Sequence, residues 1–148
     1  MTKRKKNRAR RAFTIIEVIV IVVILGVIAA VIAPRLIARV GESKRSVAVS
    51  NAASLSTAVK LFAADHGMPE PGAPITILWE RPGTIEEAAW QGKGPYVDSA
   101  DSLNDPWGNP FQLVIPPQVN ADFDIVSYGK DGQPGGEGEN ADIVNGKR

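Results

Sequence analysis

The chain has 148 residues, of which 17 are Lys or Arg and 16 are Asp or Glu, so its formal net charge is +1. It contains no cysteine, which excludes a disulfide framework, a zinc–thiolate site and a thiol nucleophile. His66 is the single histidine, which excludes a histidine cluster for a metal. Because Gly67 and Pro69 follow it and punctuate a helix C-terminus, we expect His66 to face solvent in a structural role.

The basic residues are concentrated at the N-terminus. Seven of the 17 lie within residues 1–11, where there is no acidic residue. Without residues 1–12 the chain keeps 10 basic and 16 acidic residues, a net charge of −6. Nucleic-acid binding is therefore not indicated, because the remaining chain is acidic.

An apolar segment follows the basic run. Residues 13–33 are apolar except for Thr14, Glu17 and Gly26. As a helix with a rise of about 1.5 Å per residue, this segment would span a hydrocarbon core of roughly 30 Å. The preceding positive charges should stay in the cytoplasm and leave the rest of the chain outside. A cleaved secretory signal peptide and a buried core helix are disfavoured by the length, whereas an ordinary signal anchor remains open.

Glu17 is the one charged residue within this segment. Placing a carboxylate in a membrane span costs about 2.5 kcal/mol or more, and no basic residue lies between Phe13 and Pro34. A free amine created by cleavage before Phe13 would supply the counter-charge, on the same chain or on a neighbouring copy. The alternative is a protonated Glu17 near the interfacial zone.

The pattern changes after Pro34. Gly26 weakens the helix and Pro34 should kink it or interrupt its hydrogen bonds, so we expect residues 27–33 to be helical in a single chain but pliable in a fibre. Beyond Pro34 the apolar residues recur at helical spacing, which predicts a helix that ends near residues 65–67 and packs one face against a small body. These residues are Ala48, Ala52, Leu55, Val59 and Phe62.

The remainder predicts an α+β body. Residues 75–79 fit a short strand or a turn of helix, and residues 84–90 fit a short helix with Thr84 as its N-cap. Residues 111–115 and 123–128 predict antiparallel strands in a sheet of two or three, packed on the long helix. Because no nucleophile elbow, metal-binding histidine pair or phosphate loop is present, we predict that the protein is not an enzyme.

Acidic residues gather again near the C-terminus. Asp131, Glu137, Glu139 and Asp142 lie among several glycines. Calcium takes six to eight oxygen ligands, and glycines let a loop turn its carbonyl oxygens inward. On composition alone, a solvated acidic loop and a calcium site are equally good interpretations.

Three segments carry a family resemblance. Residues 11–18, Arg-Ala-Phe-Thr-Ile-Ile-Glu-Val, resemble the class III signal of type IV pilins and pseudopilins. Residues 105–110, Asp-Pro-Trp-Gly-Asn-Pro, and residues 124–136 resemble the major pseudopilins of type II secretion. The resemblance implies cleavage between Ala12 and Phe13 by a prepilin peptidase, with methylation of the new amino terminus. Ala12 stands where that family usually has Gly.

The resemblance also implies site residues. Glu17 would pair with the amino terminus of a neighbouring Phe13, and the helix would loosen between Gly26 and Pro34 in the assembled filament. A structural calcium ion would be bound in the terminal loop. Its implied ligands are the side chains of Asp131 and Asp142, the backbone oxygens of Tyr128 and Gln133, and a third acid, for which we favour Glu137 with Glu139 and Asn140 in reserve.

The expected organisation is a cleaved leader (1–12), a transmembrane assembly helix (13–34), an amphipathic continuation (35–67) and a periplasmic α+β body (68–148). The resemblance implies a single-pass protein of the bacterial inner membrane that polymerises into a periplasmic pseudopilus and drives export of folded proteins. Implied partners are further copies of the chain, minor pseudopilins, the prepilin peptidase, the inner-membrane assembly platform and lipid, but no nucleic acid. The alternative function is a type IV pilin for adhesion or motility.

Overall fold

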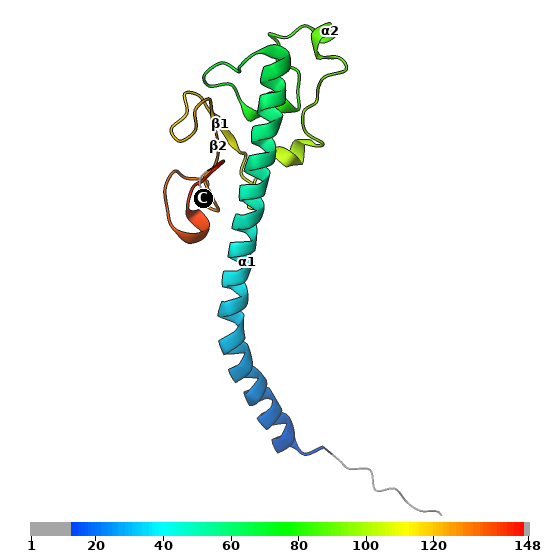
Figure 1. Ribbon diagram of the computed structural model, residues 1–148. Helices are drawn as coiled ribbons and strands as arrows, with labels where there is room; N and C mark the ends of the chain where they lie inside the picture. The colour runs from blue at the N-terminus through cyan, green and yellow to red at the C-terminus, as the bar shows by residue number, and fades with distance from the viewer. Residues whose placement is uncertain (1–12, 147–148) are drawn as a thin grey trace, which may run out of the picture. The chain divides into compact units, whose positions relative to one another are not determined.

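A computed structural model describes residues 13–146, which form one long helix, short helical turns and a small sheet (Figure 1). In chain order the elements are α1 (Ile15–His66), η1 (Ile75–Leu78), α2 (Glu87–Trp90), η2 (Ala100–Leu103), β1 (Gln112–Val114), β2 (Asp124–Ser127), η3 (Gly138–Asn140) and β3 (Ile143–Val144). The chain divides into two compact units between Ala38 and Arg39, so α1 contributes to both.

The first unit consists of the N-terminal part of α1. Its large apolar side chains are exposed in the single chain, and the most apolar window of 18 residues has a mean hydropathy of 3.3 with none of it buried. Length and composition are sufficient for a membrane span. Residues 27–33 are helical as predicted, and the helix continues through Pro34 without an end.

The second unit begins with the C-terminal part of α1, whose predicted apolar stripe is confirmed. Ala48, Ala52 and Val59 are completely buried, and Leu55 and Phe62 nearly so. The helix ends at His66, within the predicted range. Gly67 follows with a φ of +89° and donates its N–H to the carbonyl of Ala63 at 2.9 Å, which is the left-handed C-terminal geometry that glycine favours.

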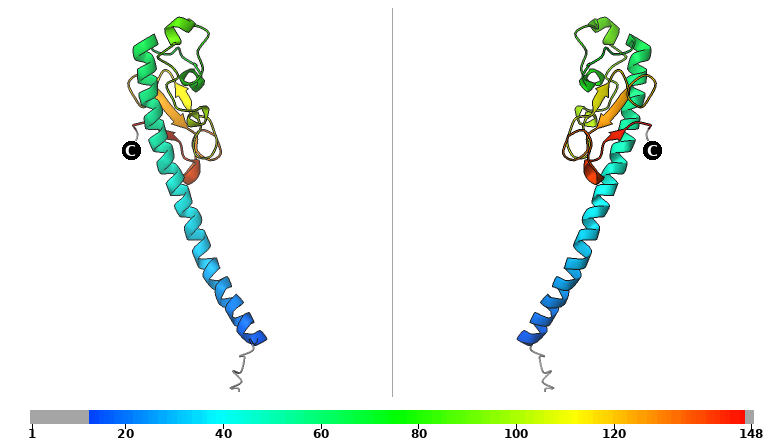
Figure 2. Two further views of the ribbon diagram at one scale, coloured as in Figure 1. Left: turned by 90° about the vertical axis from the view of Figure 1, so that its right-hand side faces the viewer. Right: turned by 90° about the vertical axis from the view of Figure 1, so that its left-hand side faces the viewer.

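The sheet has three antiparallel strands in the order β1-β2-β3. Both views in Figure 2 show it lying alongside the C-terminal part of α1. All four residues of the central strand β2 are buried. Each predicted strand is present within a shorter observed range, and β3 completes the sheet. With two residues, β3 is too short for an alternating pattern in the sequence to reveal it.

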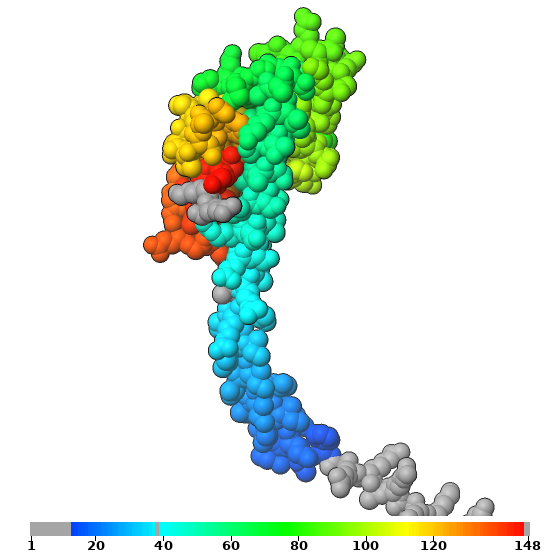
Figure 3. Space-filling view, viewed as in Figure 1, coloured from blue at the N-terminus to red at the C-terminus, as the bar shows by residue number. Residues whose placement is uncertain are grey.

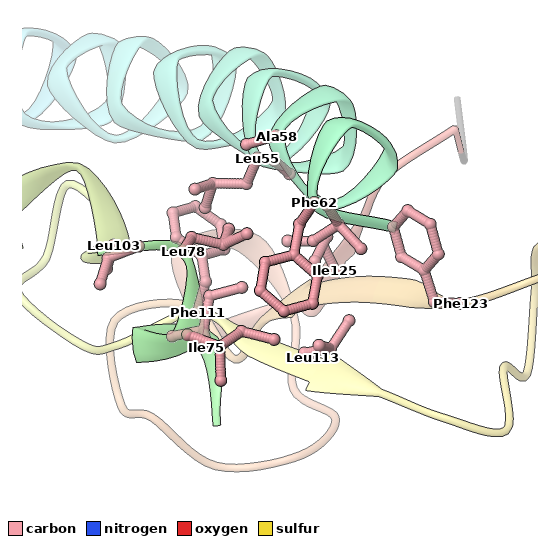
Figure 4. Close-up of a cluster of buried hydrophobic side chains, with 13 residues drawn as sticks. Leu55, Ala58, Phe62, Ile75, Leu78, Leu103, Phe111, Leu113, Phe123 and Ile125 are labelled. Atoms are coloured by element: carbon pink, nitrogen blue, oxygen red, sulfur yellow. The ribbon is translucent and has the colours of Figure 1, made fainter. Parts of the chain in front are cut away.

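The core of the second unit lies between α1, the sheet and the 3-10 turns η1 and η2 (Figure 4). Leu55 and Phe62 project from α1 toward three residues of the body: Leu78 of η1, Phe111, which precedes β1, and Ile125 of β2. All five side chains are less than 5% exposed. Burial of large aliphatic and aromatic side chains contributes roughly 1.5–3 kcal/mol each, so this cluster is the main source of stability for the body.

The structure selects one of two predicted alternatives in one segment and moves a predicted helix start in another. Residues 75–78 take the helical alternative as a 3-10 turn. The helix predicted over residues 84–90 starts only at Glu87, and its N-cap is Glu86 rather than Thr84. The reason is a preceding turn, in which Ile85 N–H donates to the carbonyl of Pro82 at 3.0 Å and the Arg81 guanidinium donates to the carbonyl of Ile85.

The solvent-facing position expected for His66 is wrong. Its ring is partly buried, with centroids 5.2 Å from Phe62 and 5.9 Å from Trp90, on which it stacks at 19°. Beside it, the hydroxyl of Tyr96 donates to Asp65 at 3.0 Å and Lys93 pairs with the same carboxylate at 3.2 Å. The chain after α2 therefore folds back over the end of α1 and covers the imidazole.

Candidate functional site: the N-terminal signal and the terminal loop

The start of α1 is organised by Thr14 and Glu17. The Thr14 hydroxyl accepts the Glu17 N–H at 3.3 Å, and Glu17 Oε2 accepts the Thr14 N–H at 3.0 Å and its hydroxyl at 2.9 Å. Because Thr14 precedes the first helical residue, these reciprocal bonds form a capping box. The carboxylate thus has local donors that were not predicted, although Thr-x-x-Glu before an apolar run is a recognised signal for them.

The surroundings of Glu17 are apolar. Phe13, Ile16, Val20 and Ile21 line a shallow groove around it. Gly26 leaves open space, since a Cβ there would meet nothing within 4 Å. Ala12, the other half of the predicted cleavage site, lies outside the described residues. Among the predicted assembly residues, Phe13 and Glu17 therefore share one groove, whereas Gly26 and Pro34 lie further along the same helix.

The segment 105–110 is fixed by a buried carboxylate. Asp105 is 5% exposed, and its Oδ1 accepts the N–H groups of Trp107 and Asn109 at 3.0 and 2.9 Å. Its Oδ2 accepts the hydroxyl of Ser127 at 2.7 Å, and the side chain of Asn109 donates to the carbonyl of Gly129 at 2.7 Å. Residues 105–110 and 124–136, two of the three segments that carry the family resemblance, are thus hydrogen-bonded to one another at the base of the terminal loop.

The terminal loop returns from β2 to β3 through several sharp turns. Gly132, Gly135, Gly136 and Gly138 all have positive φ values, which only glycine adopts readily. Figure 3 shows the loop and the strand after it, in orange to red, packed against the part of α1 that belongs to the same unit. Arg45 of α1 donates to the carbonyl of Ala141 at 3.3 Å.

The predicted calcium ligands lie on this loop, but their side chains do not all lie close to one another. Asp131 accepts the N–H of Gln133 at 3.1 Å, and both oxygens of Asp142 accept the N–H of Gly135, at 2.9 and 3.0 Å. Glu137 is exposed and Tyr128 is partly buried. Within residues 13–146, no three His, Cys, Asp or Glu side chains form a group that could hold a metal ion.

The chemistry of the donor set nevertheless fits calcium. Asp131, Glu137 and Asp142 offer only oxygen donors, and the loop contains neither histidine nor cysteine to favour a softer metal. Asp131 and Asp142 each accept a hydrogen bond from a backbone N–H of the same loop. These bonds hold both carboxylates near the turns of the loop. The calcium site stays a prediction.

Glu139, one of the reserve ligands, has a different environment. Its Oε2 lies 2.9 Å from Lys130 Nζ, and that hydrogen bond lowers the pKa of the Glu139 carboxyl, although partial burial opposes the change. Its side chain also lies over Gly41 of α1, where an added Cβ would come within 2.7 Å of Oε1. Gly41 and Lys130 gave no recognisable signal in the sequence.

Comparison with known proteins decides between a pilin and a pseudopilin. The description "Prokaryotic N-terminal methylation motif" matches residues 7–33, and "Type II secretion system (T2SS), protein G" matches residues 35–146. The chain belongs to the type II secretion system protein G family. The second match covers the body, including residues 105–110 and the terminal loop, and does not favour the pilin alternative.

Individual relatives agree with this assignment to the protein G family. Type II secretion system core protein G of Pseudomonas aeruginosa is 33% identical over 95% of this chain and 97% of its own length. The protein of the same name from Vibrio cholerae is 33% identical over 95% and 94%. The crystal structure of the major pseudopilin from the type 2 secretion system of enterohaemorrhagic Escherichia coli superposes with a TM-score of 0.58 and 28% identity, over 76% of this chain and 94% of that one.

Proposed function

We propose that this chain is the structural subunit that polymerises into the periplasmic pseudopilus of a type II secretion system and thereby drives export of folded proteins. The match of the protein G family to residues 35–146 is the observation that carries the proposal. A role without catalysis follows, since the family consists of structural subunits. The methylation motif and the exposed apolar part of α1 support a membrane anchor.

Glu17 supplies the assembly contact in this proposal. The capping box uses Oε2, which leaves Oε1 for a second donor. After a prepilin peptidase cuts between Ala12 and Phe13, the new amine of a neighbouring copy is that donor, and the exposed apolar side chains around Glu17 cover the pair. Because an isolated carboxylate in a membrane costs about 2.5 kcal/mol or more, pairing favours a staggered arrangement of subunits over isolated ones.

Orientation and partners follow from the same mechanism. The basic residues before the cut remain in the cytoplasm, which places the second unit in the periplasm. Minor pseudopilins and the inner-membrane assembly platform then meet the chain at the two ends of the growing filament. A calcium ion held by Asp131, Asp142, Glu137 and backbone oxygens of Tyr128 and Gln133 would stabilise the terminal loop by binding the folded state alone.

The test replaces Glu17 by glutamine in a secreting host that lacks its own copy of the gene. We expect the variant to insert into the membrane but to form no filament and to secrete no cargo. Glu42→Gln is the matched control, because Glu42 is an exposed glutamate of the same helix outside the apolar span. Filaments of normal length from Glu17→Gln would contradict the ionic assembly contact.

Processing has its own measurement. Mass spectrometry of the chain from filaments should show an N-methylated Phe13 as the first residue. Secretion-competent filaments that retain Met1 would refute cleavage between Ala12 and Phe13, and would leave Glu17 without the amine that the assembly mechanism requires.

A further inference from the structure

Gly41 forms a notch on the helix surface beneath the terminal loop. It is buried within α1, and a Cβ built there would lie 2.7 Å from Glu139 Oε1 and 2.9 Å from its Cδ and Cγ. Each of these distances is shorter than real Cβ contacts allow. Glycine is also disfavoured relative to alanine inside a helix, so its presence at this position needs a reason other than helix formation.

The space above Gly41 is occupied by the side chain of Glu139, which comes from the turn η3. Lys130 Nζ holds the carboxylate at 2.9 Å. Lys44, three residues beyond Gly41 and therefore on the same side of α1, acts on that carboxylate with its positive charge. Glu139 thus reaches from the loop to the helix with its carboxylate bound to Lys130.

The backbone around Glu139 is packed as closely. Lys130 N–H donates to the Glu139 carbonyl at 2.9 Å. A Cβ at Gly129 would lie 2.6 Å from that carbonyl oxygen, and one at Gly136 would lie 2.7 Å from the carbonyl oxygen of Asn140. Because Arg45 also donates to the carbonyl of Ala141, the whole turn is fastened to α1 and to the end of β2.

We propose that Glu139 is a positioning residue, not a calcium ligand, and that it seats the terminal loop on α1 in the notch at Gly41. The seat holds the two ends of the loop, with Asp131 on one side and Asp142 on the other, at a fixed separation. A loop that is already ordered loses less conformational freedom when it binds an ion, so the seat raises the calcium affinity. The effect on affinity rests on the calcium site proposed above.

The experiment uses the full chain in detergent micelles. Wild type, Gly41→Ala, Glu139→Ala and the double variant are compared by thermal unfolding in chelator and by calorimetric titration with calcium chloride. The side chain of Glu139 can swing out when Cβ is added at Gly41, so the fold should survive in all variants. We expect each single change to lower the Tm in chelator by about 4 °C and the calcium affinity on the order of tenfold.

The double variant tests the contact between Gly41 and Glu139 most directly. Once Glu139 is alanine the notch is empty, so Gly41→Ala should leave the Tm unchanged or raise it, because alanine is favoured inside a helix. The change of sign between the two backgrounds identifies the contact. Ser43→Ala, at an exposed position two residues from Gly41, is the control for helix propensity: it should raise the Tm slightly in both backgrounds and leave the calcium affinity unchanged.

Glutamine separates a positioning residue from a ligand. Glu139→Gln keeps the length and a hydrogen-bond acceptor for Lys130, so we expect its calcium affinity to stay within about threefold of wild type. A loss of calcium binding in Glu139→Gln, with an unchanged Tm in chelator, would show that Glu139 is a ligand and overturn the proposal. So would a higher Tm for Gly41→Ala in the wild-type background.

The two proposals fail in different ways. If wild type binds no calcium at millimolar concentration, the predicted calcium site is wrong, and so is the proposed effect of Glu139 on calcium affinity. The contact between Glu139 and Gly41 is still tested in chelator, by the direction in which Gly41→Ala shifts the Tm with and without the Glu139 side chain.

Discussion

The side chain of Asn145 donates a hydrogen bond to the hydroxyl of Ser56 on α1 at 3.1 Å. Its Oδ1 accepts the N–H of Ile125 at 2.7 Å, and its carbonyl accepts the side chain of Asn120 at 2.8 Å. Asn145 and Ser56 are both buried. One amide therefore joins the C-terminal segment to the helix, the central strand and the loop before it.

Replacing Asn145 by alanine should destabilise the body by about 3 kcal/mol. The change leaves the buried hydroxyl of Ser56 and the buried N–H of Ile125 without these partners, and each such group costs roughly 1–3 kcal/mol. Urea unfolding of the full chain in micelles measures the effect. Ser56→Ala removes one bond of the same network and should cost about 1 kcal/mol, so equal losses for the two variants would contradict the central position of Asn145.

Asp124 should make the body sensitive to acid. Burial by itself raises the pKa of this carboxyl, but hydrogen bonds from the backbone of Asn120, Gln118 and Val119 and from the Asn120 side chain outweigh it and lower the pKa below 3.8. The stability that these bonds contribute is present above about pH 4 and is lost as the pH falls through the folded-state pKa.

The variant Asp124→Asn tests this dependence. At neutral pH it should lose about 3 kcal/mol, because the N–H donors lose a charged acceptor. Its disadvantage relative to wild type in the free energy of unfolding should shrink as the pH falls below about 4. Asp122→Asn, an exposed neighbour, is the control. A disadvantage that stays constant over this range would show that Asp124 does not titrate with folding.

Tyr96 should limit stability at high pH. Burial, and secondarily the hydrogen bond to Asp65, raises the pKa of Tyr96 from 10.0 to about 12. Its contribution is therefore complete below pH 10 and is lost between pH 10 and about 12, on the order of 2 kcal/mol in total. Tyr96→Phe should unfold with a shallower dependence on pH over this range. Identical slopes for the two proteins would refute the coupling.

Regular patterns explain what the sequence predicted of the fold. The apolar stripe from Ala48 to Phe62 repeats at helical spacing, and that spacing is a property of the helix alone. The strand at residues 124–127 was similarly recognisable from its β-branched residues. His66 was misplaced because the rings that cover it, Trp90 and Tyr96, follow a segment rich in proline and glycine whose path has no local pattern.

The candidate sites were predictable to different degrees. Glu17 stood out because a charge within an apolar segment is rare, and its partner Thr14 was detectable through the capping-box spacing. The acids of the terminal loop were recognisable as a group, but their separate environments were not. Whether Glu139 faces an ion or α1 depends on Gly41. A glycine in a helix, far away in the sequence, gives no pattern from which its contact with Glu139 could be predicted.

The capping box predicts local fraying when Thr14 is changed. Thr14→Ala should loosen the first turn of α1 by about 1 kcal/mol, which corresponds to roughly fivefold faster amide exchange at Glu17 and Val18. Thr14→Ser should restore protection. Thr57→Ala is the control, since the Thr57 hydroxyl donates to the carbonyl of Ala53 and caps nothing. Unchanged exchange in Thr14→Ala would mean that the box contributes no stability in micelles.

Calcium should raise the unfolding temperature of wild type through the terminal loop. An ion that binds only the folded state stabilises it by about 2.7 kcal/mol at a concentration 100 times its Kd. Asp142→Ala should abolish the shift between chelator and calcium. Because this variant also loses the two contacts to the Gly135 N–H, its Tm in chelator will fall as well, and the calcium-induced difference is the decisive quantity. Asp122→Ala, outside the loop, should keep the full shift. A full shift in Asp142→Ala would remove Asp142 from the ligand set, and no shift in wild type would exclude the ion itself.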